Sequence, residues 1–264
     1  STIGLTNDHE DCENSECKLC ETDRYDQQME RVKKAISRYL DENGLVNFSN
    51  LPPAVQVMLF NAKRILKKAH NKTERCAEII QQNYVENAEQ YWLTYCEDRE
   101  QLRNLKEKLI ASGISPIYEF WSDAEGAETD FEQLDFDREA TLNMWESTGG
   151  VMLSIACLDE GVNIPCISHG VILASSQNPR QFIQRRGRLL RLSNNKTHAN
   201  IWDILVVPSS EEGGNHTNYV LAEINRALTF SSNASNHQAI QEIQNIAYRL
   251  GITLGFTGGA TEDE

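Results

Sequence analysis

The stretch Val151-Met-Leu-Ser-Ile-Ala-Cys-Leu158 is an apolar run of strand length, and Asp159-Glu-Gly-Val-Asn-Ile-Pro165 follows it as a polar, glycine-bearing turn. A second apolar run, Gly170-Val-Ile-Leu-Ala174, leads through a polar, proline-bearing segment to Gln184-Arg-Arg-Gly-Arg-Leu-Leu-Arg191. That last octet has the spacing of a helix. The order strand, loop, strand, loop, helix is typical of an α/β fold with a parallel sheet.

The octet at residues 184–191, called the arginine segment below, carries four arginines beside a glycine. An arginine side chain donates several hydrogen bonds in one plane and keeps its proton, so it suits a phosphate group. Arg188 and Arg191 have the spacing that places two side chains on one helix face. Residues 162–201 hold six Lys or Arg and no Asp or Glu, although the chain has a net charge of −14. The pattern favours an anion-binding site over its alternative, a solvated basic helix.

With the preceding loop, this region resembles motifs V and VI of the superfamily 2 helicases and translocases, at residues 158–165 and 184–191. In that family two RecA-like lobes hold one ATP between them, and both motifs belong to the second, C-terminal lobe. The resemblance implies that Arg188 and Arg191 are arginine fingers, which stabilise the charge on the transferring phosphoryl group. It also implies that Gln184 lies near the γ-phosphate or the attacking water.

Motif V in this family contacts both the nucleic-acid backbone and the nucleotide. The resemblance assigns Glu160 to the nucleic acid, and it assigns Gly161, Asn163 and Gly187 to the nucleotide. The family usually has Asp at the position of Asn163, and Asn brings no charge to that contact. Turn chemistry is the alternative explanation for Asp159 and Asn163.

A strand and a helix further upstream resemble motif IV and its helix. Residues 91–96 are rich in aromatic and branched residues, and Asp98 then starts a helix that Gly113 closes. The expected apolar face of this helix consists of Leu102, Leu105, Leu109 and Ile110. The resemblance places Thr94 and Arg99 at the nucleic-acid backbone.

Alternating strands and helices from about residue 74 to residue 256 predict an α/β fold: a RecA-like parallel sheet covered by helices on both faces, with a helical N-terminal extension. Further expected elements are strands at 114–118 and 199–207 and helices at 136–146, 218–230 and 237–250. We expect four parts: a Cys-rich leader at 1–24, a helical accessory or inter-lobe segment at 25–73, the RecA-like lobe at 74–256 and a flexible tail at 257–264.

Two amphipathic helices are expected before the lobe, at residues 26–43 and 53–72. The apolar face of the first is expected to hold Met29, Val32, Ile36, Tyr39 and Leu40. The second carries Lys63, Arg64, Lys67, Lys68 and Lys72 near its end. These basic residues either contact a nucleic-acid backbone, for which Lys63, Arg64 and Lys67 are the candidates, or simply favour the helix C-terminus.

The leader presents four candidate zinc ligands within twelve residues: His9, Cys12, Cys17 and Cys20. These side chains could close a tetrahedral zinc site. An iron–sulfur cluster with a distant fourth ligand such as Cys76, and unpaired cysteines in an acidic leader, are the open alternatives. Nine carboxylates at residues 119–139 favour a solvated acidic loop over a metal site.

The chain has seven cysteines, an odd number. It contains neither a signal peptide nor an apolar stretch of membrane length. We therefore expect an intracellular protein, cytoplasmic or nuclear, with no membrane partner.

A phosphate loop of the form G-x-x-x-x-G-K-[S/T] is missing, because no Gly-Lys pair occurs in the chain. We therefore expect no ATP hydrolysis by these residues alone. ATP with its Mg²⁺ would be shared with an N-terminal RecA-like lobe in the same or another polypeptide. Ser1 in place of Met favours a fragment of a longer helicase.

Three functions fit these patterns. The leading hypothesis is the second motor lobe of an ATP-dependent nucleic-acid helicase or translocase, which supplies arginine fingers and part of the nucleic-acid surface. Its motif V and Gln184 resemble the restriction, repair and antiviral-sensor branches more than the DEAD-box branch, so DNA is expected rather than RNA. The second hypothesis is a non-catalytic helicase-like module that binds nucleic acid or a protein partner. The third is a metal-stabilised interaction domain built on the leader.

Overall fold

The computed structural model describes residues 2–3, 21–40, 50–86, 89–121, 138–155, 167–173, 187, 198–206, 217–232, 234–236 and 238–252. The chain divides into two compact units, Ser1–Val206 and Val207–Glu264. The RecA-like lobe expected at residues 74–256 extends over both units.

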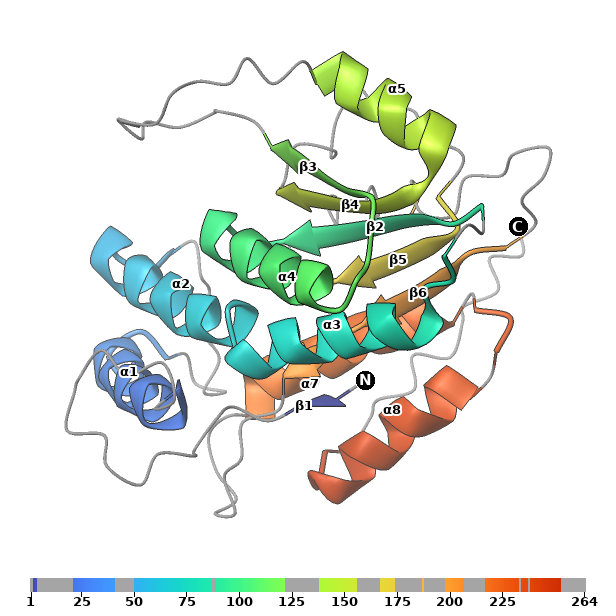
Figure 1. Ribbon diagram of the computed structural model, residues 1–264. Helices are drawn as coiled ribbons and strands as arrows, with labels where there is room; N and C mark the ends of the chain where they lie inside the picture. The colour runs from blue at the N-terminus through green and yellow to red at the C-terminus, as the bar shows by residue number, and fades with distance from the viewer. Residues whose placement is uncertain are drawn as a thin grey trace, which may run out of the picture. The chain divides into compact units, whose positions relative to one another are not determined.

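Five parallel strands form the sheet of the first unit, in the order β3-β4-β2-β5-β6 (Figure 1). These strands are β2 (Tyr91–Cys96), β3 (Ile117–Trp121), β4 (Gly150–Ile155), β5 (His169–Ile172) and β6 (Asn200–Asp203). The inner strands β2 and β4 are buried along almost their whole length, as continuous apolar runs in a parallel sheet should be. The predicted α/β fold with a parallel sheet is confirmed.

Two glycines allow β4 to begin between its neighbours. Gly149 and Gly150 have φ angles of 71° and 102°, in the region that favours glycine. A Cβ atom on Gly149 would lie 2.8 Å from the carbonyl oxygen of Gln90, and one on Gly150 would lie 2.5 Å from that of Pro116. The same two carbonyl oxygens accept hydrogen bonds from the start of β4, at 2.8 Å from the Gly150 N–H and 3.0 Å from the Val151 N–H. The missing side chains therefore permit the close approach that sets the register.

Helices α3 (His70–Asn83) and α4 (Arg99–Ala111) pack side by side against one face of the sheet (Figure 1). The start of α4 is as predicted, because the Asp98 carboxylate accepts a 3.0 Å hydrogen bond from the Gln101 N–H. The chain leaves the helix through Gly113, whose φ is 78°. The prediction for one residue of the apolar face is wrong, because Ile110 is 56% exposed, whereas its neighbour Leu109 is fully buried.

The expected helix at 53–72 is two helices. Helix α2 (Pro53–Lys67) ends, and α3 begins three residues later at His70. Neither Gly nor Pro marks this break. The cause is a distant contact, because the Glu21 carboxylate accepts a hydrogen bond from the His70 N–H and so caps a new helix.

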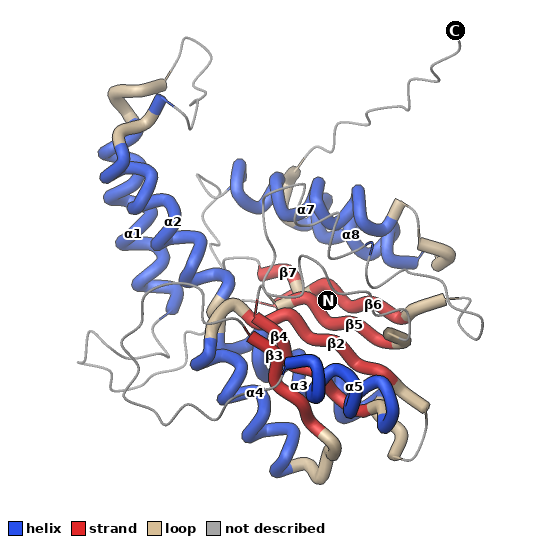
Figure 2. The backbone as a smooth tube through the Cα atoms, turned by 90° about the horizontal axis from the view of Figure 1, so that it is seen from above, coloured by secondary structure: helices blue, strands red, loops and turns tan. Residues whose placement is uncertain are grey.

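Helices α1 (Glu21–Ile36) and α2 lie side by side and form the predicted helical N-terminal extension (Figure 2). Tyr25 and Val32 of α1 are buried. The helix expected at 26–43 starts earlier and ends at Ile36, so two residues of its predicted apolar face lie beyond it. These are Tyr39 and Leu40, which are exposed.

The last strand predicted in the first unit, at residues 199–207, is divided. Its first half is β6, and its second half, β7 (Leu205–Val206), pairs in parallel with β1 (Thr2–Ile3) as a separate two-stranded sheet. Helix α5 (Arg138–Thr148) packs near β3.

The second unit contains α7 (Thr217–Ser231) and α8 (Gln238–Arg249), which agree with the predicted helices. A buried ion pair between Arg226 and Glu223, 2.9 Å apart, lies on α7. Over the described residues of both units, no helix has the length and apolar character needed to cross a membrane.

Candidate functional site

The carboxyl ends of the five parallel strands lie along one edge of the sheet, where open α/β sheets form their ligand sites. Strands β4 and β5 flank β2. Strand β4 ends at Ile155 and β5 ends at Ile172, both at this edge, one on each side of β2. In the sequence, the motif V residues follow β4 and the arginine segment follows β5.

Most of the predicted nucleotide and catalytic residues lie outside the described part of the chain: Glu160, Gly161, Asn163, Gln184, Arg188 and Arg191. Gly187 is described, in a helical conformation. It is exposed, and a Cβ atom there would meet no other atom within 4 Å.

The turn after β2 is the centre of a charge cluster. Glu97 accepts a 3.2 Å hydrogen bond from the ammonium of Lys67, and Asp98 lies 2.7 Å from the ammonium of Lys68. Lys68 also binds Glu100 at 2.7 Å. Partial burial lowers the pKa of Lys68, but the hydrogen bonds to Asp98 and Glu100 outweigh it and raise the pKa above its ordinary value. The cluster ties the end of α2 to the start of α4.

The residues predicted to contact nucleic acid differ in their accessibility. Thr94 is fully buried inside the sheet, so its side chain reaches no surface where a nucleic acid could bind. Arg99 is exposed, and its guanidinium lies 5.5 Å from the ring centroid of Trp121, as in a cation–π contact. The side chain of Arg64 is 62% exposed, and its guanidinium lies 3.6 Å from the Asp98 carboxylate. Lys63 is less exposed, at an intermediate level of burial.

Lys72, predicted to lie at the basic end of a helix, is buried. Its side chain is in the core, and its ammonium donates a 2.6 Å hydrogen bond to the carbonyl oxygen of Leu173, just after β5. Lys72 lies four residues before Cys76 on the buried stripe of α3. This spacing is the sequence signal that could have predicted the burial of Lys72. The contact joins α3 to the end of the strand that precedes the arginine segment.

The candidate metal ligands do not come together in the described residues. His9, Cys12, Cys17 and Cys20 lie outside them. Cys76 is fully buried in the core, and burial raises the pKa of its thiol. The ranges that the structure describes contain no group of three metal-binding side chains.

The family assignment comes from residues 71–193, which match the helicase conserved C-terminal domain. These residues form a helicase C-terminal domain. The domain spans α3, strands β2 to β5 and the arginine segment, and the match confirms the predicted C-terminal, RecA-like lobe. Helices α1 and α2 precede it.

Three solved structures show a weak similarity to this chain. The Pyrococcus furiosus Hef helicase domain is 18% identical with a TM-score of 0.39, over 70% of this chain and 35% of that one. The E. coli DEAD-box protein SrmB bound to RraA is 15% identical with a TM-score of 0.37, over 51% and 70%. The C-terminal domain of the DEAD-box protein Dbp5 is 13% identical with a TM-score of 0.42, over 68% and 93%. The chain thus spans about a third of the Hef structure, and the assignment depends on residues 71–193. No curated protein matches the chain.

Proposed function

We propose that the chain is the second motor lobe of an ATP-dependent nucleic-acid helicase or translocase of superfamily 2. One observation carries the proposal: β4 and β5, which precede the motif V residues and the arginine segment in the sequence, end at the same edge of the parallel sheet, inside the stretch that matches the helicase C-terminal domain. Ligands of open α/β sheets bind at that edge.

In this proposal, the arginine segment acts on the nucleotide. Arg188 and Arg191 stabilise the charge that develops on the transferring phosphoryl group, and Gln184 lies near the attacking water. Gly161, Asn163 and Gly187 border the nucleotide. Arginine fingers accelerate such reactions by about 10³-fold to 10⁵-fold.

A first RecA-like lobe, in the same or another polypeptide, would supply the phosphate loop for ATP and Mg²⁺, because this chain has no Gly-Lys pair. The proposal therefore assigns no hydrolysis to this chain alone. The chain would contribute the arginine fingers and part of the nucleic-acid surface.

The proposed nucleic acid is DNA, on the resemblance of motif V and Gln184 to the restriction and repair branches. Glu160 and Arg99 remain in the contact surface, whereas the burial of Thr94 leads us to leave it out. A phosphate could replace Asp98 as the partner of Arg64, whose side chain is mostly exposed. Lys67 would first have to leave Glu97.

A non-catalytic module that docks nucleic acid or a protein partner is the second candidate. Zinc at His9, Cys12, Cys17 and Cys20 stays a separate prediction. Metal analysis of the purified protein tests it, and a folded, metal-free sample would contradict it.

The test is ATP hydrolysis by the complete protein that contains this chain. We expect Arg188→Ala and Arg191→Ala each to reduce nucleic-acid-stimulated turnover by about 10³-fold or more while ATP binding persists. Arg186→Ala is the matched control, because helical spacing places residue 186 on another face than residues 188 and 191. Unchanged turnover in both finger variants would contradict the proposal.

A further inference from the structure

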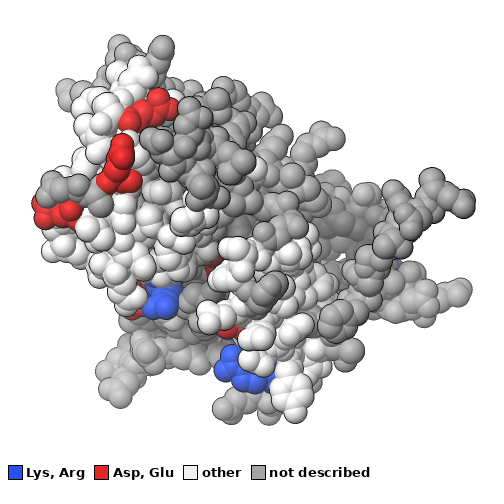
Figure 3. Space-filling view, turned by 90° about the vertical axis from the view of Figure 1, so that its right-hand side faces the viewer, with Lys and Arg blue, Asp and Glu red and all other residues white. Residues whose placement is uncertain are grey.

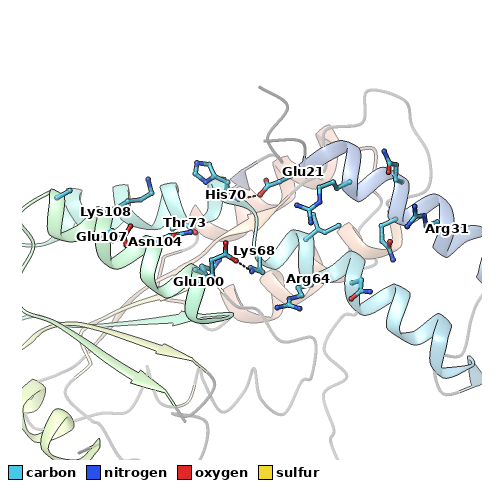
Figure 4. A pocket seen from close by; sticks show the side chains of 17 residues that line it. Glu21, Arg31, Arg64, Lys68, His70, Thr73, Glu100, Asn104, Glu107 and Lys108 are labelled. Atoms are coloured by element: carbon cyan, nitrogen blue, oxygen red, sulfur yellow. Dashed lines mark hydrogen bonds and ion pairs between the residues drawn. The ribbon is translucent and has the colours of Figure 1, made fainter. Parts of the chain in front are cut away.

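A groove of about 1100 Å³ lies between α1, α2 and α4 (Figure 4). Helix α1 lines it with one stripe at helical spacing: Glu21, Arg24, Gln27, Gln28 and Arg31. Helix α2 adds Asn61 and Arg64, its C-cap residue Lys68 also lines the groove, and α4 adds Asn104, Glu107 and Lys108 at the same kind of spacing. Three helices thus turn a polar stripe toward one space.

The groove is positively charged in a strongly acidic protein. Five Lys or Arg and three Glu line it, which gives a formal charge of +2, whereas the whole chain has −14. By contrast, the coloured residues on the face drawn in Figure 3 include only isolated Lys and Arg, and acidic side chains gather toward one side of it. An anionic ligand would therefore be attracted to the groove.

Several charges in the groove are already engaged. Lys68 binds Asp98 and Glu100, and Lys108 lies 2.6 Å from Glu74. The Glu21 carboxylate is buried against the first turn of α3.

Two arginines of α1 remain for a ligand. Arg24 and Arg31 are exposed, and neither has an ion-pair partner among the residues that the structure describes. Arg64, on the facing helix, has a longer ion pair with Asp98, at 3.6 Å, as its one ion pair in the described part of the chain.

The spacing of the two arginines suits a polymer of phosphates. Arg24 and Arg31 are two helical turns apart, about 10.5 Å along the axis of α1. That length is about three rises of 3.4 Å along the axis of a duplex. The groove is also larger than the range of roughly 300–1,000 Å³ that is usual for small-molecule pockets.

The other polar residues of the groove suit the sugars and bases of a nucleic acid. Gln27, Asn61 and Asn104 carry side-chain amides, which both donate and accept hydrogen bonds. Sugars and base edges offer both kinds of partner.

We propose that this groove binds the backbone of a nucleic acid, with Arg24 and Arg31 as the main phosphate contacts and Arg64 as a third. The inference rests on the proposed function, because it assumes that the chain works on nucleic acid. It adds a contact surface upstream of residues 71–193, on helices that the helicase C-terminal domain does not include.

The test is fluorescence anisotropy of the chain with three labelled probes: a short DNA duplex, the matching single-stranded DNA and the matching single-stranded RNA, each at several salt concentrations. At about 0.1 M salt, Arg24→Gln and Arg31→Gln are each expected to weaken binding about eightfold. The slope of log Kobs against log salt becomes shallower by about 0.9 per lost contact on a duplex and by about 0.7 on a single strand. The probe with the larger effect identifies the form of nucleic acid.

Glu107→Gln is expected to strengthen nucleic-acid binding, whereas the arginine variants weaken it. Removal of this carboxylate from the groove has an effect that a damaged fold would not produce. The matched control is Arg249→Gln, an exposed arginine on α8 in the other compact unit, which leaves affinity and slope unchanged. Circular dichroism checks that each variant is folded.

Two results would overturn the inference. In one, wild-type protein binds a probe, but the Arg24→Gln/Arg31→Gln double variant has the same affinity and slope; the proposed function then still stands on Arg188 and Arg191. In the other, no nucleic-acid probe binds, or polyglutamate binds in an Arg24-dependent way and nucleic acid does not. The proposed function fails separately, if the finger variants keep full hydrolysis.

Discussion

The backbone N–H of His70 donates a 2.7 Å hydrogen bond to the Glu21 carboxylate, which joins the first residue of α3 to the first residue of α1. The residue before α3, Ala69, offers no side-chain cap. Glu21 replaces that cap from a position 49 residues away, and its negative charge is favourable at a helix N-terminus. The contact holds α1 beside the start of the helicase C-terminal domain.

Removal of this distant cap should destabilise the fold. We expect Glu21→Ala to lower the free energy of unfolding by about 1–2 kcal/mol, because the N-terminus of α3 loses its acceptor. Urea denaturation measures the change. Glu21→Gln keeps an acceptor without the charge, so its stability should lie between those of the wild type and Glu21→Ala. A wild-type urea midpoint for Glu21→Ala would contradict the capping role.

The ion pair between Lys67 and Glu97 should couple α2 to the turn after β2. Both side chains are about a quarter exposed, at 27% and 23%, so solvent screens the pair only in part. We expect a double-mutant cycle with Lys67→Gln and Glu97→Gln to give a coupling energy of about 0.5–1 kcal/mol. Additive single effects would mean that the two groups do not interact.

Gly150→Ala should be the more damaging of two glycine substitutions. The new Cβ atom would meet the Pro116 carbonyl oxygen, and the backbone conformation disfavours any side chain. We expect a loss of about 3 kcal/mol in unfolding free energy. Gly113→Ala is the control, because its φ is also positive but no atom lies within 4 Å of the added Cβ. It should cost about 1 kcal/mol, and equal losses would rule out the steric explanation.

His169 should make the fold less stable in mild acid. Its ring stacks on Trp92 with centroids 4.4 Å apart, and burial, followed by the charge of His198, lowers its pKa from the ordinary value of 6.5. The unfolded chain therefore binds this proton at a higher pH than the folded chain does. Stability should fall as the pH drops below about 6.5, until the lower folded pKa is reached.

A pH series of urea unfolding measures that loss. His169→Phe keeps an aromatic ring beside Trp92 but cannot be protonated. We expect its stability to change less than that of the wild type between neutral pH and mild acid. Parallel curves for the two proteins would assign the acid sensitivity to other groups.

Local sequence signals predicted the sheet well. Strand β2 coincides with the predicted run at residues 91–96 because every residue after the first is buried in a parallel sheet, so the apolar run marks both ends. Asp98 and Gly113 likewise mark the ends of α4 through their own backbone chemistry. The arginine fingers stay a prediction from the residue types and spacing of the arginine segment.

Tertiary contacts decided what the sequence could not. The start of α3 depends on Glu21, and no local signal at residues 68–70 reveals that partner. Lys67 was predicted as a candidate phosphate contact, yet it pairs with Glu97, 30 residues away. The groove of α1, α2 and α4 exists only when three distant stripes meet, so the role proposed for Arg24 and Arg31 required the structure.

The most direct test of the central claim compares ATP hydrolysis, with and without duplex DNA, by this chain alone and by the complete protein that contains it. A split motor predicts no hydrolysis by the chain alone, and DNA-stimulated hydrolysis by the complete protein that is lost with Arg188→Ala. No hydrolysis in either form, or full activity in the Arg188→Ala protein, would contradict the claim that this chain is the second lobe of an ATP-driven motor.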